Sequence, residues 1–254
     1  MHLPWLTVGL TLTWGLFSFT SNFQLQAKPI ARTLIPVTQS LFRLSLNFEP
    51  PTDGRIPRQG RRDAGSRPGC PPVDKPLTAL VPEYDLGLTV EEHPTFWVYI
   101  PYPSQISHSA KFVLWDDKQD KVYETTFQLK DTPGIISLSL PKYISLDISK
   151  IYKGAFFFKC GDIGLANVQW KVKRVTLSAS LRSQLERATS RERIALYATN
   201  GLWHDALTEL AQLRRRNPQD EILAVDWTEL LRDADVHLDD MVEVSIVGCC
   251  IPER

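Results

Sequence analysis

The chain has 254 residues, and its 43% hydrophobic and 23% charged content is that of an ordinary globular protein with room for one large or two small domains. Lys and Arg together number 29, as do Asp and Glu, so the formal charge is zero. A chain without an overall basic field does not attract a phosphate backbone, and we expect no nucleic-acid partner.

The first predicted element is a secretory signal. Trp5 to Phe19 is uncharged, too short to span a bilayer comfortably, and of the right length for the hydrophobic region of a signal peptide. Leu25-Gln26-Ala27 offers a cleavage site, which predicts a signal peptide over residues 1–27. Because the usual Lys or Arg before the apolar run is missing, an uncleaved N-terminal anchor is the alternative. We expect an exported protein (periplasm, cell envelope or extracellular) with no integral membrane domain after cleavage.

Residues 28–72 are predicted to form a linker rich in Pro, Gly and Arg. Apolar and polar residues alternate from Phe42 to Phe48, which indicates a short strand that could join the main sheet. Six prolines and four glycines between Glu49 and Pro72 prevent a packed core. Five arginines and two aspartates between Asp53 and Arg67 give a local charge of +3. Such an arm could bind phosphate, lipid headgroups or acidic glycans, but a solvated spacer is the preferred interpretation.

Residues 73–178 are predicted to form the β domain. Short apolar or alternating runs are separated by turn residues every 8 to 12 positions, a pattern typical of an antiparallel β-sandwich of six to seven strands. A jelly roll or an open barrel are alternatives. Polar residues from Asp116 to Lys121 indicate a hairpin. The predicted strands are Leu86–Thr89, Thr95–Ile100, Ala110–Trp115, Val122–Leu129, Ile135–Leu140, Tyr152–Cys160 and Asn167–Leu177.

The strand Thr95–Ile100 carries large apolar residues on both faces and therefore needs cover on both sides. If one face is open, its aromatic residues could stack on sugar rings or hold a peptide. The candidate binding surface is Trp97, Tyr99, Tyr102 and Trp203. The preferred interpretation is that the helical tail covers this face, with Trp203 and Trp227 inserted against it.

Residues 179–235 are predicted to be a helical hairpin plus a capping helix, followed by a tail over 236–254. Thr189 and Glu192 form a capping box, and Asn200-Gly201 stops the helix that they begin. The second half of the hairpin resembles a tetratricopeptide repeat. The matching residues are Tyr197, Gly201, Trp203, Ala206, Leu207, Leu210, Leu213, Asn217 and Pro218. Since only one unit is present, the hairpin must dock on the β domain or on a partner.

Four cysteines are consistent with disulfides in an exported protein. Cys70 precedes the β region and Cys160 ends a strand, so a bond between them would attach the preceding segment to the sheet. Two free thiols in a reducing cytosol are the alternative. Cys249 and Cys250 could form a second bridge, an intermolecular link or a lipid-modified tail, and the sequence does not rank these.

A search for chemistry finds no common catalytic or phosphate-binding motif. We assign no catalytic residue, metal ligand or cofactor. Asp116, Asp117 and Asp120 could gather Ca²⁺, but a solubilising role is preferred. His93 near a carboxylate is the best catalytic candidate, and His204 is expected on an exposed helical face. The carboxylates considered with His93 are Glu91, Glu92 and Asp162.

Longer runs of residues resemble a known family, the exported and largely cyanobacterial domain-of-unknown-function family 928. The similarity extends over about 61 to 232 and implies an exported β domain with a helical tail, but no reaction. The runs are Arg61–Arg67, Cys70-Pro71, Lys75–Glu83, Leu86–Pro101, Thr132–Ile135 and Gly201–Ala206.

We therefore expect an exported, non-catalytic interaction protein that binds a protein or an envelope polymer through its sheet aromatics and helical tail. A hydrolase of extracellular polymers, using carboxylate and His chemistry, is the alternative. A third hypothesis is an envelope scaffold linked through Cys249 and Cys250. The oligomeric state is not predicted.

Overall fold

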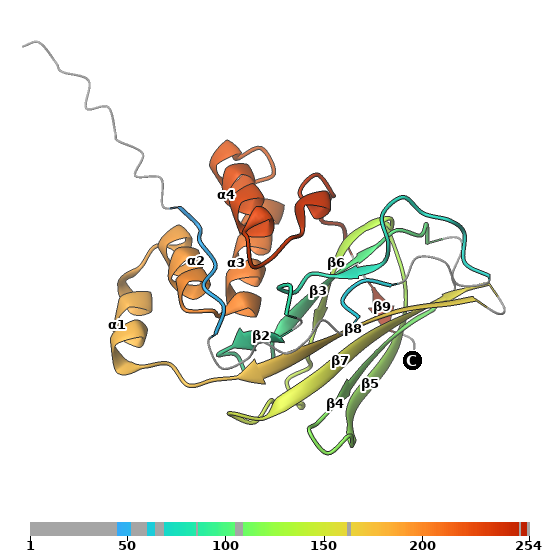
Figure 1. Ribbon diagram of the computed structural model, residues 1–254, viewed down its shortest axis with the longest axis horizontal. Coiled ribbons are helices and arrows are strands. Elements are labelled where there is room, and N and C mark those ends of the chain that lie inside the picture. Colours follow the sequence, from blue (N-terminus) through green and yellow to red (C-terminus); the bar gives the residue numbers. More distant parts are fainter. Residues whose placement is uncertain are drawn as a thin grey trace, which may run out of the picture. The chain divides into compact units, whose positions relative to one another are not determined.

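Strands occupy the middle of the chain and helices follow them (Figure 1). The computed structural model describes residues 45–51, 60–63, 69–84, 86–104, 109–161, 164–248 and 250–252, so the predicted signal peptide lies outside the described residues. The strands are β1 (Thr78–Ala79), β2 (Leu86–Thr89), β3 (Thr95–Ile100), β4 (Ala110–Trp115), β5 (Lys121–Gln128), β6 (Gly134–Ser139), β7 (Ile151–Cys160), β8 (Gly164–Arg174) and β9 (Ile251–Pro252). The helices are α1 (Ala179–Arg187), α2 (Ser190–Thr199), α3 (Trp203–Arg216), α4 (Glu221–Arg232) and the 3₁₀ helix η1 (Asp239–Met241). The fold class is α+β with a helical tail, as expected.

The strands form two sheets. β1, β3 and β6 make an antiparallel sheet in the order β1-β3-β6. The larger sheet has the order β2-β8-β7-β4-β5-β9. Its pairs are antiparallel except that β2 runs parallel to β8, which differs from the expectation of a purely antiparallel sandwich. A parallel pair needs a long crossover, and β3 to β7 supply one because they lie between the two strands in the sequence.

The alternation of apolar residues predicted the main strands well. The bounds of β2, β3 and β4 are as expected, and the other long strands differ by a few residues at their ends. β1 and β9 were not predicted because two-residue strands leave no pattern. The hairpin after β4 is confirmed: the Asp116 carboxylate accepts hydrogen bonds of 2.9 Å from the N–H groups of Lys118 and Asp120.

The first core lies between the two sheets. One face of β3, carrying Phe96, packs against inward-facing residues of the larger sheet. The ring of Trp170 is stacked on Phe112 with 5.8 Å between centroids. Gly154 makes room for this ring, since a Cβ there would lie 2.5 Å from Trp170 Cε2. The Trp170 ring can therefore lie against β7 only because position 154 has no side chain.

The second core covers the other face of β3 and shares residues between strands and helices. Trp97 and Ile135 of the smaller sheet pack with Leu207 of α3 and Trp227 of α4. α3 contacts β2 and β3, so the helical part docks directly on the β strands. β3 is therefore covered on both sides, as its two apolar faces required.

The segment before the linker packs on the helices rather than on the sheet. Leu46 and Phe48 are buried, but residues 45–51 form no strand, so the strand that the alternation allowed is not formed in this described segment. The Phe48 N–H donates to Asp233 Oδ2 at 2.9 Å, and the Glu49 N–H donates to the Ala198 carbonyl at 3.1 Å. An alternation of apolar and polar residues indicates that one side of a segment is buried, but it does not show which element packs against that side.

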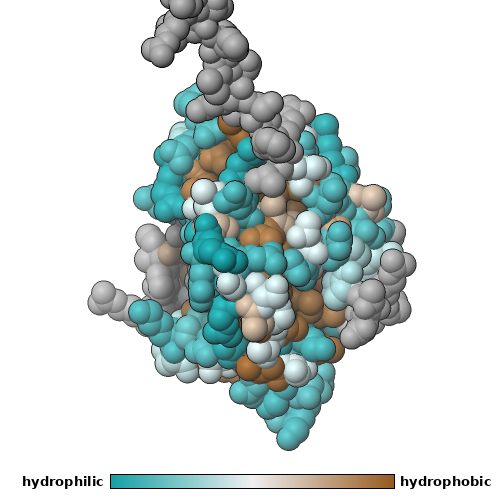
Figure 2. Space-filling model, turned by 90° about the vertical axis from the view of Figure 1, so that its left-hand side faces the viewer, coloured by the Kyte–Doolittle hydropathy of each residue, from teal (hydrophilic) through white to brown (hydrophobic). Residues whose placement is uncertain are grey.

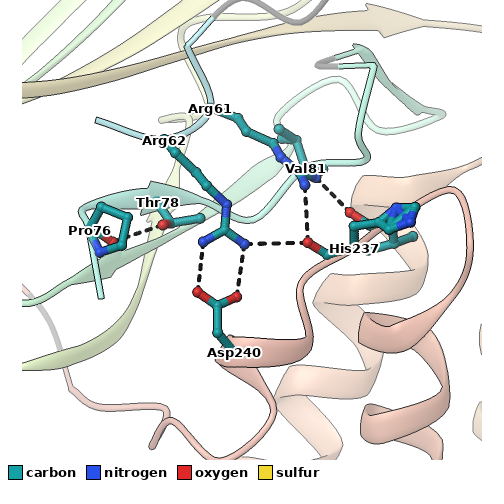
Figure 3. Close-up of polar contacts among 8 residues, drawn as sticks. Arg61, Arg62, Pro76, Thr78, Val81, His237 and Asp240 are labelled. Carbon is teal, nitrogen blue, oxygen red and sulfur yellow. Dashed lines mark hydrogen bonds and ion pairs between the residues drawn. The ribbon is translucent and has the colours of Figure 1, made fainter. Parts of the chain in front are cut away.

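Two arginines of the linker are bound to the fold (Figure 3). Arg61 donates to the carbonyls of Val81 (2.9 Å) and Val236 (2.6 Å). Arg62 donates hydrogen bonds to both carboxylate oxygens of Asp240, at 2.7 and 2.8 Å, and these bonds lower the pKa of Asp240. The expectation of a solvated spacer is therefore wrong for these residues, because guanidinium groups that satisfy buried carbonyls and a carboxylate are part of the structure.

Cys70 and Cys160 form a disulfide with an S–S distance of 1.99 Å, as predicted. It joins the segment before β1 to the end of β7. Cys249 lies outside the described residues, and the state of the Cys249-Cys250 pair remains a prediction. Within the described part of the chain, none of the helices combines the length and apolar character needed to cross a membrane.

We predict that Cys70→Ser and Cys160→Ser destabilise the protein equally. The bond closes a loop with a sequence separation of 90, for which the chain-entropy model gives about 4.6 kcal/mol. The double substitution should cost little more than either single one, because both remove the same cross-link. Urea unfolding of the three variants measures this, and additive losses would contradict a bond in the native protein.

Candidate functional site

The four aromatic residues expected to form a binding surface are buried. Trp97 donates its indole N–H to Thr208 Oγ1 of α3 at 3.0 Å, and Trp203 donates to the Leu80 carbonyl at 2.8 Å. Tyr102 is stacked on Phe158 inside the first core, with 4.6 Å between centroids. The relative exposures are Trp97 2%, Tyr99 8%, Tyr102 2% and Trp203 0%. The helices cover Trp97 and Tyr99 on this face of β3, so the preferred interpretation of a covering tail is confirmed and an exposed aromatic platform is wrong.

A groove of about 450 Å³ lies where the β2–β3 connection meets α2 and α3. We call it the polar groove, because ionisable, hydroxyl and amide side chains dominate its lining. Figure 2 views the molecule from the left-hand side of Figure 1 and shows many hydrophilic residues on that side, with hydrophobic patches between them. The groove is lined by Thr89, Glu91, His93, Pro94 and Thr95 from the strand side, and by Arg193, Tyr197, His204, Asp205, Thr208, Glu209, Gln212 and Arg216 from the helices.

Asp205 connects the first turn of α3 to β2. Its Oδ1 accepts a hydrogen bond from the Thr89 hydroxyl at 3.3 Å, and its Oδ2 accepts one from the Val90 N–H at 3.2 Å. Burial raises the pKa of Asp205 to about 7, with Glu91 adding to the rise and the two hydrogen bonds opposing it. Near neutral pH the groove therefore contains a carboxyl that gains or loses a proton readily.

His204, the neighbour of Asp205, is buried instead of lying on an exposed helical face as expected. Its ring meets Phe96 edge-on at 5.1 Å, and a Cβ on Gly87 would lie 2.4 Å from Nε2. Neither ring nitrogen has a hydrogen-bond partner among the described residues. Burial lowers the pKa of His204 to about 3, so the imidazole is neutral at physiological pH. The neutral ring packs between α3 and the strands.

The helical wall of the groove is held by an ion pair. Arg193 of α2 donates from Nε to Glu209 of α3 at 3.2 Å and makes a second, closer contact with the same carboxylate. This hydrogen bonding raises the pKa of Arg193. Burial raises the pKa of Tyr197 to about 12, with Asp205 and Glu209 adding to the rise, so its hydroxyl stays protonated. These contacts fix the spacing of α2 and α3 along the groove.

The residues suggested for hydrolytic chemistry are only partly brought together. Glu91 and His93 both line the groove, and His93 Nδ1 lies 2.8 Å from the Ile144 carbonyl. Glu92 instead accepts a hydrogen bond from Arg174 at 2.8 Å, and its other oxygen lies 4.0 Å from His93 Nε2. Asp162 lies outside the described residues. The sequence thus identified one wall of the groove.

Sequence reasoning missed the opposite wall. Arg193 and Tyr197 are four residues apart on α2, and Asp205 and Glu209 are four apart on α3, so each pair shares a helix face. A search for polar residues at helical spacing could have found both faces. It could not have shown that they face the β2–β3 connection.

No metal site is visible in the part of the chain that the structure describes: no group of three or more His, Cys, Asp or Glu residues is placed to hold an ion. Asp116, considered for Ca²⁺, uses its Oδ1 to cap the hairpin turn. His237 lies 3.4 Å from Glu83 through Nδ1.

A family model described as Domain of Unknown Function (DUF928) matches residues 62–246. The matched region contains strands β1 to β8, helices α1 to α4 and all residues of the polar groove. A search of curated proteins found no match.

We predict opposite pH dependences from the two neighbouring buried groups. Since the pKa of Asp205 is raised to about 7, its contribution to stability is full below about pH 4 and is lost as pH rises through 7. Since the pKa of His204 is lowered to about 3, its contribution is full above about pH 6.5 and is lost as pH falls toward 3. Between about pH 4 and 6.5, rising pH therefore lowers the contribution of Asp205 to stability and raises that of His204.

The variant Asp205→Asn isolates these effects. The difference in free energy of unfolding between the native protein and this variant should be largest near pH 4 and should decline as pH rises through 7. Chemical denaturation at several pH values measures it, with Glu209→Gln as a control that changes a carboxylate of the same helix. A difference independent of pH would contradict the raised pKa.

Proposed function

The chain belongs to the DUF928 family, and because the description of that family assigns no activity, we propose a function from the polar groove. The protein is an exported, non-catalytic binding protein whose groove holds a polar segment of a protein or an envelope polymer. The binding site is the groove and not the buried aromatic residues of β3.

The observation that supports binding over catalysis is that the fold already engages the ionisable groups deepest in the groove. Both oxygens of Asp205 accept hydrogen bonds from β2 and its flank, and Arg193 holds Glu209. Groups committed in this way form a rigid polar wall, and preorganised polar walls favour recognition because little side-chain entropy is lost on binding. Glu91, Gln212 and Arg216 at the rim are exposed and available to a ligand.

Export is supported by two independent features. The apolar segment Trp5 to Phe19 has the composition of a signal-peptide hydrophobic region. The disulfide Cys70–Cys160 is the kind of cross-link that persists in oxidising compartments such as the periplasm or the cell exterior. A ligand in that compartment is a polymer or protein of the envelope.

A hydrolase is the second candidate, favoured by one observation. Glu91 and His93 line the same groove as Asp205, whose pKa of about 7 suits proton transfer near neutral pH. In this case turnover of a glycan or ester by the native protein would fall with Glu91→Gln and His93→Gln. Turnover without detectable binding of an intact partner would replace the binding proposal.

We predict that the triple variant Glu91→Gln, Gln212→Ala, Arg216→Ala loses at least about tenfold in affinity for the envelope component that the native protein captures. These three rim side chains make no hydrogen bond or ion pair among the described residues, so the fold should be unaffected. Thermal unfolding verifies this, and quantitative capture from envelope extracts measures the loss. A truncation after Leu177 is a poor test, because it would expose the second core on β3.

The matched control is Arg182→Ala with Glu186→Gln on α1. Both residues are exposed and lie outside the groove, and the changes remove one charge of each sign, as in the test variant. The control should capture the component as the native protein does. Equal capture by all three proteins would place the binding site elsewhere and contradict the proposal.

A further inference from the structure

The six-stranded sheet has an outer face that the groove does not use. Along β4, β7 and β8, alternate residues such as Phe112, Phe156 and Trp170 are buried in the first core. Since successive side chains of a strand point to opposite sides, the residues between them point outward. The strand pairing places these outward residues in rows across the sheet.

The charged residues at the outward positions of β4, β7 and β8 are all lysines. Five lysines point outward from β4, β7 and β8, and the carboxylate of Glu124 on β5 is near Lys111. We call these five the lysine face: Lys111, Lys153, Lys159, Lys171 and Lys173. The protein as a whole has no net charge, so this is a local excess.

The centre of the lysine face carries an unfavourable arrangement. Lys153 is directly opposite Lys171 in the β7–β8 pairing, and Lys173 follows on the same face of β8. Like charges at opposed positions of an antiparallel pair destabilise a sheet. None of the three forms an ion pair among the described residues, whereas Lys150 is held by Asp147 at 2.7 Å.

Aromatic and amide groups lie among the lysines. Trp115 is opposite Lys153 on β4, and the ammonium of Lys153 is 5.7 Å from the centre of its ring. Phe157 is opposite Lys111, and both aromatic rings are partly exposed. Gln169 lies opposite Ala155, in the row between that of Lys171 and that of Phe157, and adds an amide there. Flat rings can stack on sugars, an amide can bind hydroxyl groups, and ammonium groups attract carboxylates.

We propose that the lysine face binds an acidic polysaccharide, with Lys153, Lys171 and Lys173 on its carboxylates and Trp115 against a sugar ring. Charge complementarity argues for this occupant, because a polyanion removes the repulsion that the sheet otherwise bears. The face does not depend on the groove, and either site can fail its test without the other.

Two other polyanions fit less well. The outward positions of β4, β7 and β8 contain no arginine, which is the residue best suited to paired hydrogen bonds with phosphate. Proteins that bind a membrane surface insert apolar side chains among the lipids. On β4, β7 and β8, Leu165 is the large aliphatic residue with high exposure, at 43%, which is too little for such insertion. Carboxylate-bearing sugars match lysine, tryptophan and glutamine together.

The test is affinity electrophoresis of the full mature chain in gels that contain polygalacturonate, with dextran as the neutral polymer. The native protein should be retarded by polygalacturonate and not by dextran, and the retardation should weaken as salt is added. The variant Lys153→Gln, Lys171→Gln, Lys173→Gln should bind at least about tenfold more weakly. The matched control, Lys118→Gln, Lys130→Gln, Lys142→Gln, removes the same charge from exposed positions outside the face and should bind like the native protein.

A stability measurement separates lost binding from misfolding. Because the test variant removes opposed like charges, its melting temperature should equal or exceed that of the native protein. Equal weakening by test and control variants would mean general charge attraction and would overturn the proposal. Binding to phosphatidylglycerol vesicles but not to polygalacturonate would overturn it in favour of a lipid surface, and binding to neither polymer nor vesicles would overturn it outright.

Discussion

Strand β3 has large apolar side chains on both faces, and the need to bury both determines how the other elements are arranged. The six-stranded sheet covers one face, where Phe96 meets Trp170, and α3 with its neighbours covers the other, where Trp97 meets Thr208. Burying one large apolar side chain contributes about 1.5–3 kcal/mol, so neither cover can be lost without exposing several such contributions. The helical part is therefore required by the strands and is not an appendage to them.

This constraint also explains what the sequence could and could not predict. Alternation in β2, β3 and β4 gave their bounds, and Thr189 with Glu192 gave the start of α2, because these patterns act within a few residues. What covers a buried pattern is decided by segments far away in sequence. For that reason Leu46 was assigned to the wrong partner, and His204 was placed on the surface although Gly87 and Phe96 enclose it.

The polar groove arises where the two layers over β3 meet. The hydrogen bond between Trp97 and Thr208 fixes the position of α3. Asp205, three residues before Thr208, and Glu209, directly after it, are thereby brought next to the β2–β3 connection. Glu91 and His93 were identifiable from sequence as polar residues at a strand entrance, but the helical wall was not, because only the docking of α3 brings the walls together. Packing in the core thus decides where the ionisable groups converge.

The two kinds of cation in this protein are used differently. Arg61, Arg62 and Arg193 direct their guanidinium groups to internal carbonyls and carboxylates, where a planar fork satisfies more than one acceptor. Lys153 and Lys171 form no ion pair among the described residues and lie opposite each other on adjacent strands, and Lys153 has only the ring of Trp115 near its ammonium. Two like charges that weaken the sheet and have no carboxylate partner in the fold are accounted for by an external anion. These three arginines therefore belong to the architecture, and the opposed lysines belong to the proposed interface with another molecule.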